Sequence, residues 1–168
     1  MRIMNNEAQQ IILALQLISH PEGGFFRETY RAGETCSTSS DARRNYSTAI
    51  YYLLAEEQIS RFHRIKSDEI WHFYSGCGVT IHCLDPAAGY KKLSVGIELA
   101  AGACPQVIIP KNTWFAAELV DKRAYALCGC TVSPGFDFAD FEFGDRTKLC
   151  AEFPGQVDLI ERFTRPRP

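Results

Sequence analysis

The sequence has no long hydrophobic run. The longest fully apolar stretch near its start covers residues 11–15 and ends at Gln16, whereas a helix needs about 20 apolar residues to cross a bilayer. The first six residues do not lead into the apolar region and small-residue cleavage site of a signal peptide. We therefore expect no membrane-spanning segment and a soluble, cytoplasmic protein.

An excess of charge of either sign is also missing. Eighteen lysines and arginines stand against twenty aspartates and glutamates, the net charge is −2, and no long basic run occurs. Because nucleic acids and anionic membranes are recognised by clustered positive charge, we expect neither as a partner. The twelve glycines and eight prolines are close to the globular average, which excludes collagen-like and low-complexity chains.

The seven cysteines contain no Cys-x-x-Cys pair of the kind that builds a zinc ribbon. In a reducing cytosol, cysteines serve as small apolar core residues, and we expect that role here. Cys128 and Cys130 point to the same side of a strand and could share a soft metal, but the sequence offers no second pair to complete such a site.

The length and apolar content indicate one globular domain. The chain has 168 residues, of which 46% are hydrophobic and 23% charged, and a domain takes about 100–200 residues. Apolar residues from Ile11 to Ile18 recur with helical spacing, and Pro21 closes the pattern. We expect an N-terminal helix within residues 1–20, a barrel over 21–135, and a C-terminal strand and helix cover over 136–168.

The barrel assignment rests on short runs with strand character, separated by turn residues. An exposed loop is predicted at residues 31–45, and helices are predicted at 145–152 and 156–163. Regular short strands favour an antiparallel sandwich or barrel, so the fold class is mainly β. The predicted strands cover residues 25–30, 47–54, 58–65, 69–74, 79–84, 91–98, 106–109, 114–119 and 124–131.

The densest group of reactive side chains lies at residues 61–76. A turn in the middle of this segment predicts that the strand with His63 pairs with the strand that begins at Glu69. Side chains alternate between the two faces of a strand, so Glu69, Trp71 and Phe73 share one face. If that face and the His63 face both line the barrel interior, the imidazole and the carboxylate approach each other.

An imidazole beside a carboxylate supports two kinds of site. The pair can bind a divalent metal ion, or it can act as a base and the group that orients it. His72 and Tyr74 would then face the other way, towards a second sheet or a subunit interface. A register shifted by one residue would instead place Glu69 in solvent.

The spacing of these residues resembles the first motif of the cupin superfamily, which has the form His-x-His, three or four residues, Glu, six residues and Gly. His63, Glu69 and Gly76 occur in that spacing, while Ile65 stands in place of the second histidine. The resemblance implies a metal site, which in most cupins has four protein ligands.

A second cupin motif, Pro-x-Gly followed two residues later by a histidine ligand, resembles the segment that begins at Pro110. Here Asn112 replaces the glycine and Phe115 replaces the histidine. Two of the four usual ligands are therefore missing, and a divalent metal held by His63 and Glu69 is an open alternative.

Three blocks, at residues 21–30, 62–76 and 130–141, are similar to the cupin family numbered five, a domain of unknown function. This resemblance covers nearly the whole chain. It implies a double-stranded β-helix, or jelly-roll barrel, and a homodimer, and it implies no settled activity.

The first block is also similar, more distantly, to the entry strand of nucleotide-sugar 3,5-epimerases, which carry Arg-Gly-Phe-Phe-x-Glu. Residues 24–28 match that run, Gly23 replaces its arginine, and His63 falls near the epimerase base. No segment matches the tyrosine acid of those enzymes, so Tyr74 and Tyr30 are candidates for an acid by position alone.

Other side chains are candidates for ligand contact. An arginine can bind an anionic group with two parallel hydrogen bonds, or can pair with a nearby glutamate instead. Aromatic rings can stack on a sugar or a base, or can simply fill the barrel core. The candidate residues are Arg27, Arg61, Trp71, Phe73, Trp114 and Phe115.

The segment 136–143 alternates phenylalanines with acidic residues. As a strand it would present one apolar face, and we expect it to seal the barrel rather than to carry chemistry.

These observations leave three functions open. The first is small-molecule binding in the barrel with isomerase or epimerase chemistry, in which His63 is the base, Glu69 its orienting group and Tyr74 the acid. The second is a binding or sensing module without turnover. A metal-dependent oxygenase is the least supported, because such sites use two histidines and a carboxylate.

Overall fold

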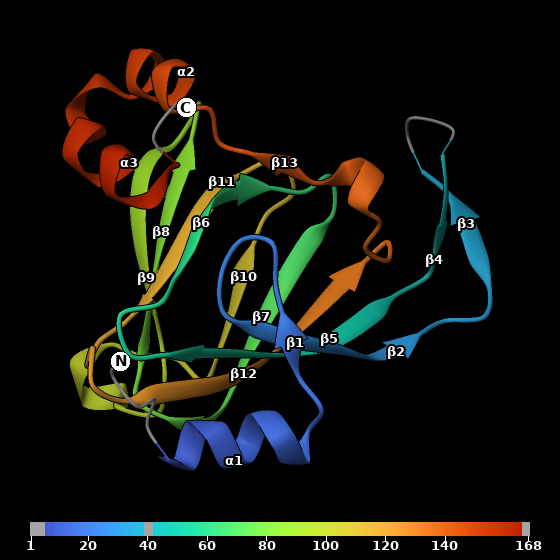
Figure 1. Cartoon of the computed structure of the whole chain (residues 1–168). Helices are drawn as coiled ribbons and strands as arrows, with labels where there is room; N and C mark the ends of the chain where they lie inside the picture. Colours follow the sequence, from blue (N-terminus) through green and yellow to red (C-terminus); the bar gives the residue numbers. More distant parts are fainter. Residues whose placement is uncertain (1–5, 39–41, 166–168) are drawn as a thin grey trace.

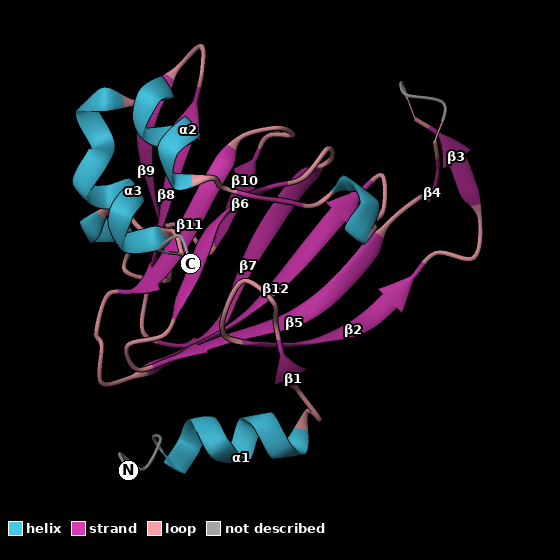
Figure 2. Ribbon diagram, turned by 45° about the horizontal axis from the view of Figure 1, so that its top comes forward, coloured by secondary structure: helices cyan, strands magenta, loops and turns pink. Residues whose placement is uncertain are grey.

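Two antiparallel β-sheets form the body of the protein (Figure 1, Figure 2), in a computed structural model that describes residues 6–38 and 42–165. The larger sheet has the strand order β1 (Ile18–Ser19), β2 (Phe25–Arg31), β5 (Thr48–Ala55), β12 (Tyr125–Ser133), β7 (Asp68–Gly76) and β10 (Gln106–Ile109). The smaller sheet has the order β13 (Glu142–Phe143), β6 (Ile59–Arg64), β11 (Trp114–Leu119), β8 (Val79–Asp85) and β9 (Gly89–Val95).

The alternation of side chains along β5 shows how the interior is divided. Thr48, Ile50, Tyr52 and Leu54 all point between the sheets, as a period of two requires. Leu54 belongs to the buried apolar core, Thr48 and Ile50 line a cavity, and Tyr52 stands at the boundary and belongs to both. One end of the barrel is therefore filled with side chains and the other end is hollow.

Helices cover the outer faces of both sheets. Helix α1 (Asn6–Ala14) packs through Ala8 on the larger sheet. Helices α2 (Arg146–Glu152) and α3 (Val157–Phe163) pack against Phe62 and Trp114 on the smaller sheet. Short 3-10 helices lie at η1 (Leu99–Ala101), η2 (Phe138–Asp140) and η3 (Pro154–Gln156). No helix in the described ranges is both long enough and apolar enough to span a membrane.

The mainly β jelly-roll fold predicted from the sequence is confirmed, and several elements differ locally from the prediction. The N-terminal helix ends at Ala14, because Gln16 takes a left-handed conformation with φ of 54°, and Ile18 lies exposed in β1. The predicted exposed loop 31–45 contains a hairpin of β3 (Thr35–Ser37) and β4 (Arg43–Asn45). The predicted strand 91–98 begins earlier and ends at Val95.

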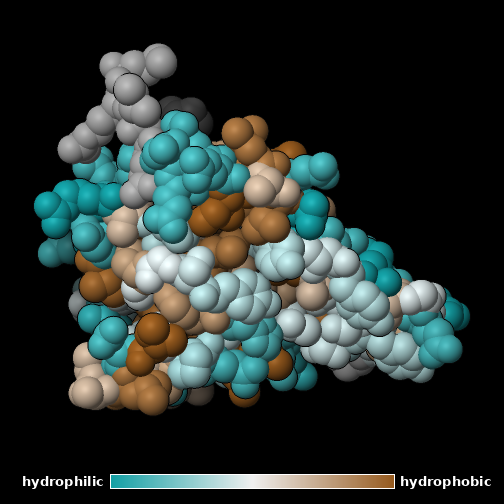
Figure 3. All heavy atoms as spheres, turned by 90° about the horizontal axis from the view of Figure 1, so that it is seen from below, coloured by the Kyte–Doolittle hydropathy of each residue, from teal (hydrophilic) through white to brown (hydrophobic). Residues whose placement is uncertain are grey.

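The hairpin projects from the body on the right of Figure 1. The face seen in Figure 3 narrows towards the same side, and its hydrophobic residues form separate groups among hydrophilic ones.

The cysteines are all free thiols, and of the seven only Cys83, Cys128 and Cys130 are fully buried. Cys104 is exposed, so the prediction that the cysteines are core residues is wrong for that position.

Because α2 packs on the smaller sheet, we expect replacement of a leucine in α2 to destabilise the protein more than replacement of an exposed leucine in α1. Leu149 in α2 is 1% exposed, whereas Leu13 in α1 is 77% exposed. We expect Leu149→Ala to lower the free energy of unfolding by about 2–5 kcal/mol, because it removes buried methyl groups and leaves a cavity. The matched Leu13→Ala change should alter it by less than about 0.5 kcal/mol. Urea unfolding measures both, and equal losses would contradict the packing described here.

Candidate active site

The hollow end of the barrel holds a cavity of about 270 Å³. Its walls are mostly apolar, while ionisable groups gather on one side. This combination of an apolar pocket and a few convergent polar groups is typical of small-molecule sites. The lining includes His20, Glu22, Phe26, Glu28, Arg31, Ile50, Tyr52, His63, Ile65, Glu69, Cys130, Phe136, Asp137, Phe138 and Phe141.

Glu22 reaches the cavity because the two glycines that follow it lie directly against neighbouring strands. Gly23 and Gly24 have φ of 123° and 72°, a region that favours glycine. A Cβ at Gly23 would collide with the carbonyl oxygen of Ile59, and one at Gly24 would lie 2.6 Å from a backbone oxygen of β5. The Arg61 backbone N–H donates to the carbonyl of Glu22 at 3.0 Å, which fixes Glu22 beside β6.

His63 is held at both ring nitrogens. Its Nε2 lies 2.9 Å from Oε2 of Glu22, and its Nδ1 lies 2.7 Å from the carbonyl oxygen of Arg61. A carbonyl oxygen and an ionised carboxylate can only accept hydrogen bonds, so beside an ionised Glu22 both nitrogens carry protons and the ring is an imidazolium. Phe115 and Phe141 flank this ring at centroid distances of 4.0 and 5.3 Å.

The pKa values of this pair agree with the geometry. Burial alone would raise the pKa of Glu22, but the charge and hydrogen bond of His63 outweigh burial and hold that pKa at about 2. Burial would likewise lower the pKa of His63, and the Glu22 carboxylate raises it above its ordinary value instead. The hydroxyl of Ser60 also donates to Glu22 at 2.9 Å. Glu22 and His63 therefore form a buried ion pair.

Glu69 lines the same cavity and behaves in the opposite way. Burial raises the pKa of Glu69 to about 7, and the negative charge of Glu22 adds to that effect, while the positive charge of His63 opposes it. Two carboxyl groups in one cavity thus have widely separated pKa values. This is the arrangement by which a site assigns different roles to two acids.

His20 and Tyr52 complete the polar side of the cavity. The Glu22 backbone N–H approaches Nδ1 of His20 at 3.4 Å, and burial lowers the pKa of His20, so this ring is neutral. The Tyr52 hydroxyl donates to the carbonyl of Gly23 at 2.7 Å. Burial raises the pKa of Tyr52 well above its ordinary value, so the phenol keeps its proton.

The segment after β12 forms the mouth of the cavity. Residues predicted as one strand, 136–143, instead form η2 and the two-residue β13. Phe136, Phe138 and Phe141 line the cavity. This segment encloses the cavity. Its phenylalanines are further candidates for ligand contact, which the sequence pattern alone does not identify.

The structure brings His63 and Glu69 into one cavity, but the predicted pairing of their strands is wrong. Strand β6, with His63, pairs with β11 and β13 in the smaller sheet, and β7, with Glu69, pairs with β10 and β12 in the larger one, so the two side chains reach the cavity from different sheets. The ion-pair partner of His63, however, is Glu22 and not Glu69. Tyr74 is 52% exposed and lies on the outer face of the larger sheet, against Tyr51. Tyr30 is also exposed and does not line the cavity. The assignment of the acid to either tyrosine is therefore corrected.

The predicted arginine and aromatic ligand contacts lie outside the cavity lining. Arg27 packs over the Tyr51 ring on the outer face, with 5.7 Å between its guanidinium carbon and the ring centroid. Arg61 donates to the carbonyl of Glu22 at 3.1 Å from outside the lining.

The four aromatic residues also have structural contacts. Trp71 is buried in the core against Tyr52, and Phe73 packs on the same core. Trp114 faces α2 and α3, and Phe115 lies behind His63. These four residues are corrected from ligand contacts to packing residues.

The residues present do not fit the metal of the cupin motifs. Both nitrogens of His63 are hydrogen-bonded, Ile65 lines the cavity where a second histidine is expected, and Phe115 packs on the His63 ring. Within residues 6–38 and 42–165, no three His, Cys, Asp or Glu side chains are arranged to hold one metal ion. These contacts do not support the predicted metal at His63 and Glu69, and among the described residues no third donor completes a site at Cys128 and Cys130.

The fold and the cavity define a cupin-type barrel with an apolar-walled cavity at the place of the motif metal. The chain belongs to the family described as Cupin superfamily (DUF985), which it matches over residues 9–144.

Similar proteins come from distant organisms. An uncharacterised protein of Saccharomyces cerevisiae is 32% identical over 149 residues, which cover 80% of this chain and 74% of the relative. A hypothetical protein from Leishmania major has 31% identity and a TM-score of 0.88, covering 95% of this chain and 99% of that one. A protein of Shewanella oneidensis has 34% identity and a TM-score of 0.87, covering 98% and 100%.

The raised pKa of Glu69 predicts a pH-dependent difference in stability between the protein and Glu69→Gln. Between pH 4.5, the ordinary pKa, and about 7, the folded protein keeps the Glu69 proton while the unfolded chain loses it. The wild type therefore loses stability as the pH rises through this window, by at most about 1.4 kcal/mol per pH unit. Glu69→Gln lacks this loss, so its stability relative to wild type should rise from pH 4.5 to 7 and level off above.

Urea unfolding at a series of pH values measures this difference. Glu142→Gln, the same change at an exposed carboxylate, serves as the control and should follow the wild-type profile. Parallel profiles for Glu69→Gln and wild type would show that Glu69 titrates normally and is not buried as described.

Proposed function

We propose that the protein binds a compact small molecule in the barrel cavity and transfers a proton to and from it, as an isomerase or epimerase does. The observation that carries this proposal is the separation of the two buried carboxyl groups. Glu22 stays ionised beside His63, while Glu69 has a pKa of about 7 and can exchange its proton near neutral pH.

The proposed reaction starts at a carbon next to a carbonyl group of the ligand. The Glu69 carboxylate accepts the proton from that carbon, and the electron pair moves to the carbonyl oxygen to give an enolate. The His63 imidazolium lines the same cavity and, although it is paired with Glu22, stabilises the developing enolate electrostatically. Protonated Glu69 then returns the proton, to the same carbon or to its neighbour. His63, already protonated, is not the base in this scheme.

A binding or sensing module without turnover is the second candidate. The closed hydrogen bonding of His63 favours it, because Glu22 and the Arg61 carbonyl occupy both ring nitrogens without any ligand. The metal-dependent oxygenase is not proposed, since the described residues contain no three His, Cys, Asp or Glu side chains arranged like the two histidines and carboxylate of such a site.

The homodimer stays a prediction, and we propose the outer face of the larger sheet as its site. Tyr74 and Ile108 are more than half exposed on that face, and exposed apolar groups on a sheet commonly mark an interface. The cytoplasmic location also stays a prediction.

Solvent deuterium exchange tests the proposed chemistry. In D₂O, a substrate among a panel of keto sugars, keto acids and amino sugars should gain deuterium next to its carbonyl, as mass spectrometry detects. Glu69→Gln should slow this exchange by about 10²–10⁴-fold, because it removes the proton acceptor. Glu142→Gln is the matched control and should retain the wild-type rate.

Two outcomes would contradict the proposal. Stoichiometric ligand binding without any exchange would leave the binding module as the function. Exchange that persists in Glu69→Gln but is lost in His63→Asn would return the role of the base to His63.

A further inference from the structure

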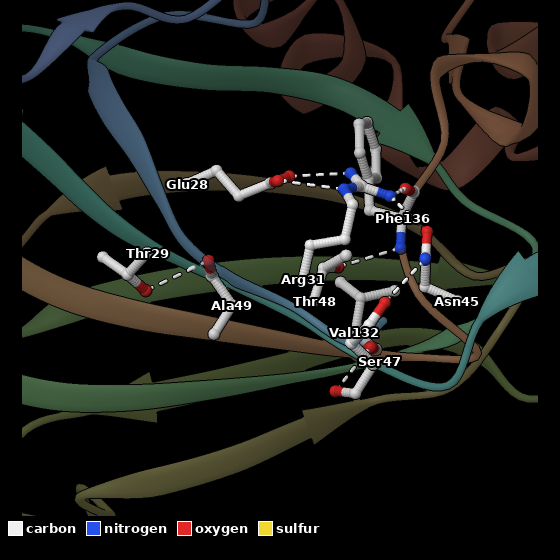
Figure 4. Close-up of polar contacts among 10 residues, drawn as sticks. Glu28, Thr29, Arg31, Asn45, Ser47, Thr48, Ala49, Val132 and Phe136 are labelled. Atoms are coloured by element: carbon white, nitrogen blue, oxygen red, sulfur yellow. Dashed lines mark hydrogen bonds and ion pairs between the residues drawn. The ribbon is translucent and has the colours of Figure 1, made fainter. Parts of the chain in front are cut away.

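The mouth of the cavity carries an arginine whose hydrogen bonds are already made (Figure 4). The Nε and Nη2 atoms of Arg31 donate to both carboxylate oxygens of Glu28 at 2.9 and 2.7 Å. Its Nη1 donates to Oδ1 of Asn45 at 2.8 Å and to the carbonyl of Phe136 at 3.1 Å. An arginine has five N–H donors, so Arg31 has almost no capacity left to bind an anionic ligand.

More carboxyl groups than positively charged side chains line the cavity. Arg31 is the one arginine or lysine that lines the cavity among the described residues. Besides its partner Glu28 it faces Asp137, whose charge raises the pKa of Arg31 further. Asp137 also accepts the Ala139 N–H at 2.8 Å. Among the residues that line the mouth, two carboxylates, Glu28 and Asp137, therefore stand against the one guanidinium of Arg31.

The nearby cations lie outside the lining, and their hydrogen bonds and ion pairs go to Asp140, although the charge of Arg44 also acts on Asp137. Arg44 holds both oxygens of Asp140 at 2.7 and 2.9 Å, and Lys66 also approaches Asp140 at 3.4 Å. None of these three residues lines the cavity. Deeper inside, the charge of His63 is compensated by Glu22, which leaves Glu69 without a lining cation of its own.

Aromatic rings stand beside these carboxylates. The rings of Phe136 and Phe138 lie 5.0 Å apart and nearly perpendicular, and Phe141 lies about equally far from both, at 6.3 and 6.2 Å. Phe138 is 57% exposed at the mouth. The face of an aromatic ring carries negative charge density and attracts cations. Rings and carboxylates around one opening favour a positively charged ligand.

We propose that the ligand of this cavity is a small organic cation, a protonated primary amine on a compact body, with its ammonium group held among Asp137, Glu28 and the three phenylalanine rings. This inference rests on the proposed function and names its substrate class. An amino sugar or an amino ketone combines such an amine with the carbonyl that the proposed proton transfer needs. A diphosphate or carboxylate ligand would meet the carboxylates of the mouth and is disfavoured.

Three monosubstituted benzenes of similar size and different charge test the inference at pH 7.5: benzylamine, benzyl alcohol and benzoate. Saturation-transfer NMR detects their binding, and titration gives the dissociation constants. We expect benzylamine to bind on the order of tenfold more tightly than benzyl alcohol, and benzoate to bind most weakly. Benzoate binding as tightly as benzylamine would overturn the inference.

Glu28→Gln gives a sharper test, because it releases Arg31 from its carboxylate partner. In this variant the mouth loses one negative charge and gains a guanidinium with free donors, so benzoate should bind more tightly and benzylamine more weakly than in wild type. Glu142→Gln is the matched control, since it removes a carboxylate that pairs with Arg64 outside the lining. An unchanged order of affinities in Glu28→Gln would contradict the inference.

If Glu28→Gln fails to fold, a second variant, Asp137→Asn, tests the same inference. Asp137→Asn removes a carboxylate that is exposed and not bound bidentately, and it should weaken benzylamine while leaving benzyl alcohol unchanged. Equal weakening of both probes, or of neither, would count against the charge selectivity.

Failure of this inference is distinguishable from failure of the proposed function. If benzylamine and benzyl alcohol bind equally, and Ile50→Trp abolishes both by filling the cavity, the charge selectivity is wrong and binding in the barrel is retained. If none of the three probes binds, the inference is wrong, and the deuterium exchange experiment decides the proposed function separately.

Discussion

The contact between Glu22 and His63 determines the character of the cavity. A buried carboxylate is unfavourable without a partner, and so is a buried imidazolium. The two charges are tolerable together because Ser60 and the Arg61 carbonyl satisfy the remaining hydrogen bonds. The contact depends in turn on the turn at Gly23 and Gly24, since side chains there would push Glu22 away from β6. A local backbone feature thus fixes the electrostatics of a site built from distant strands.

The ion pair also explains why Glu69 differs from Glu22. Only one carboxylate can pair closely with His63, and the second one faces burial together with the charge of the first. The result is one permanently charged pair and one carboxyl group that titrates near neutrality. In cupin barrels with the full motif, histidines and a glutamate hold a metal at this place. Here Ile65 and Phe115 stand at two of the ligand positions, and proton transfer to an organic ligand is the function that we propose for the remaining groups.

The sequence predicted the fold well because strand alternation and turn residues are local signals. It placed the strands that became β5, β7 and β12, and it placed His63, Ile65 and Glu69 on inward faces. It could not assign Trp71 correctly, because alternation tells which face a residue occupies and not whether that part of the barrel is core or cavity. Trp71 shares a face with Glu69 but lies deeper, within the filled end. Glu22 was missed because its approach to His63 spans forty residues of chain and depends on glycines with positive φ.

The central claim is that His63 is a buried imidazolium paired with Glu22. Nitrogen-15 NMR of the histidine-labelled protein tests it most directly, since the ring shifts report protonation at each nitrogen, and a His63→Asn sample identifies the signal among the four histidines. The account predicts that both nitrogens of His63 are protonated at pH 7 and remain so above the ordinary histidine pKa. A neutral His63 ring with one unprotonated nitrogen at pH 7 would contradict it.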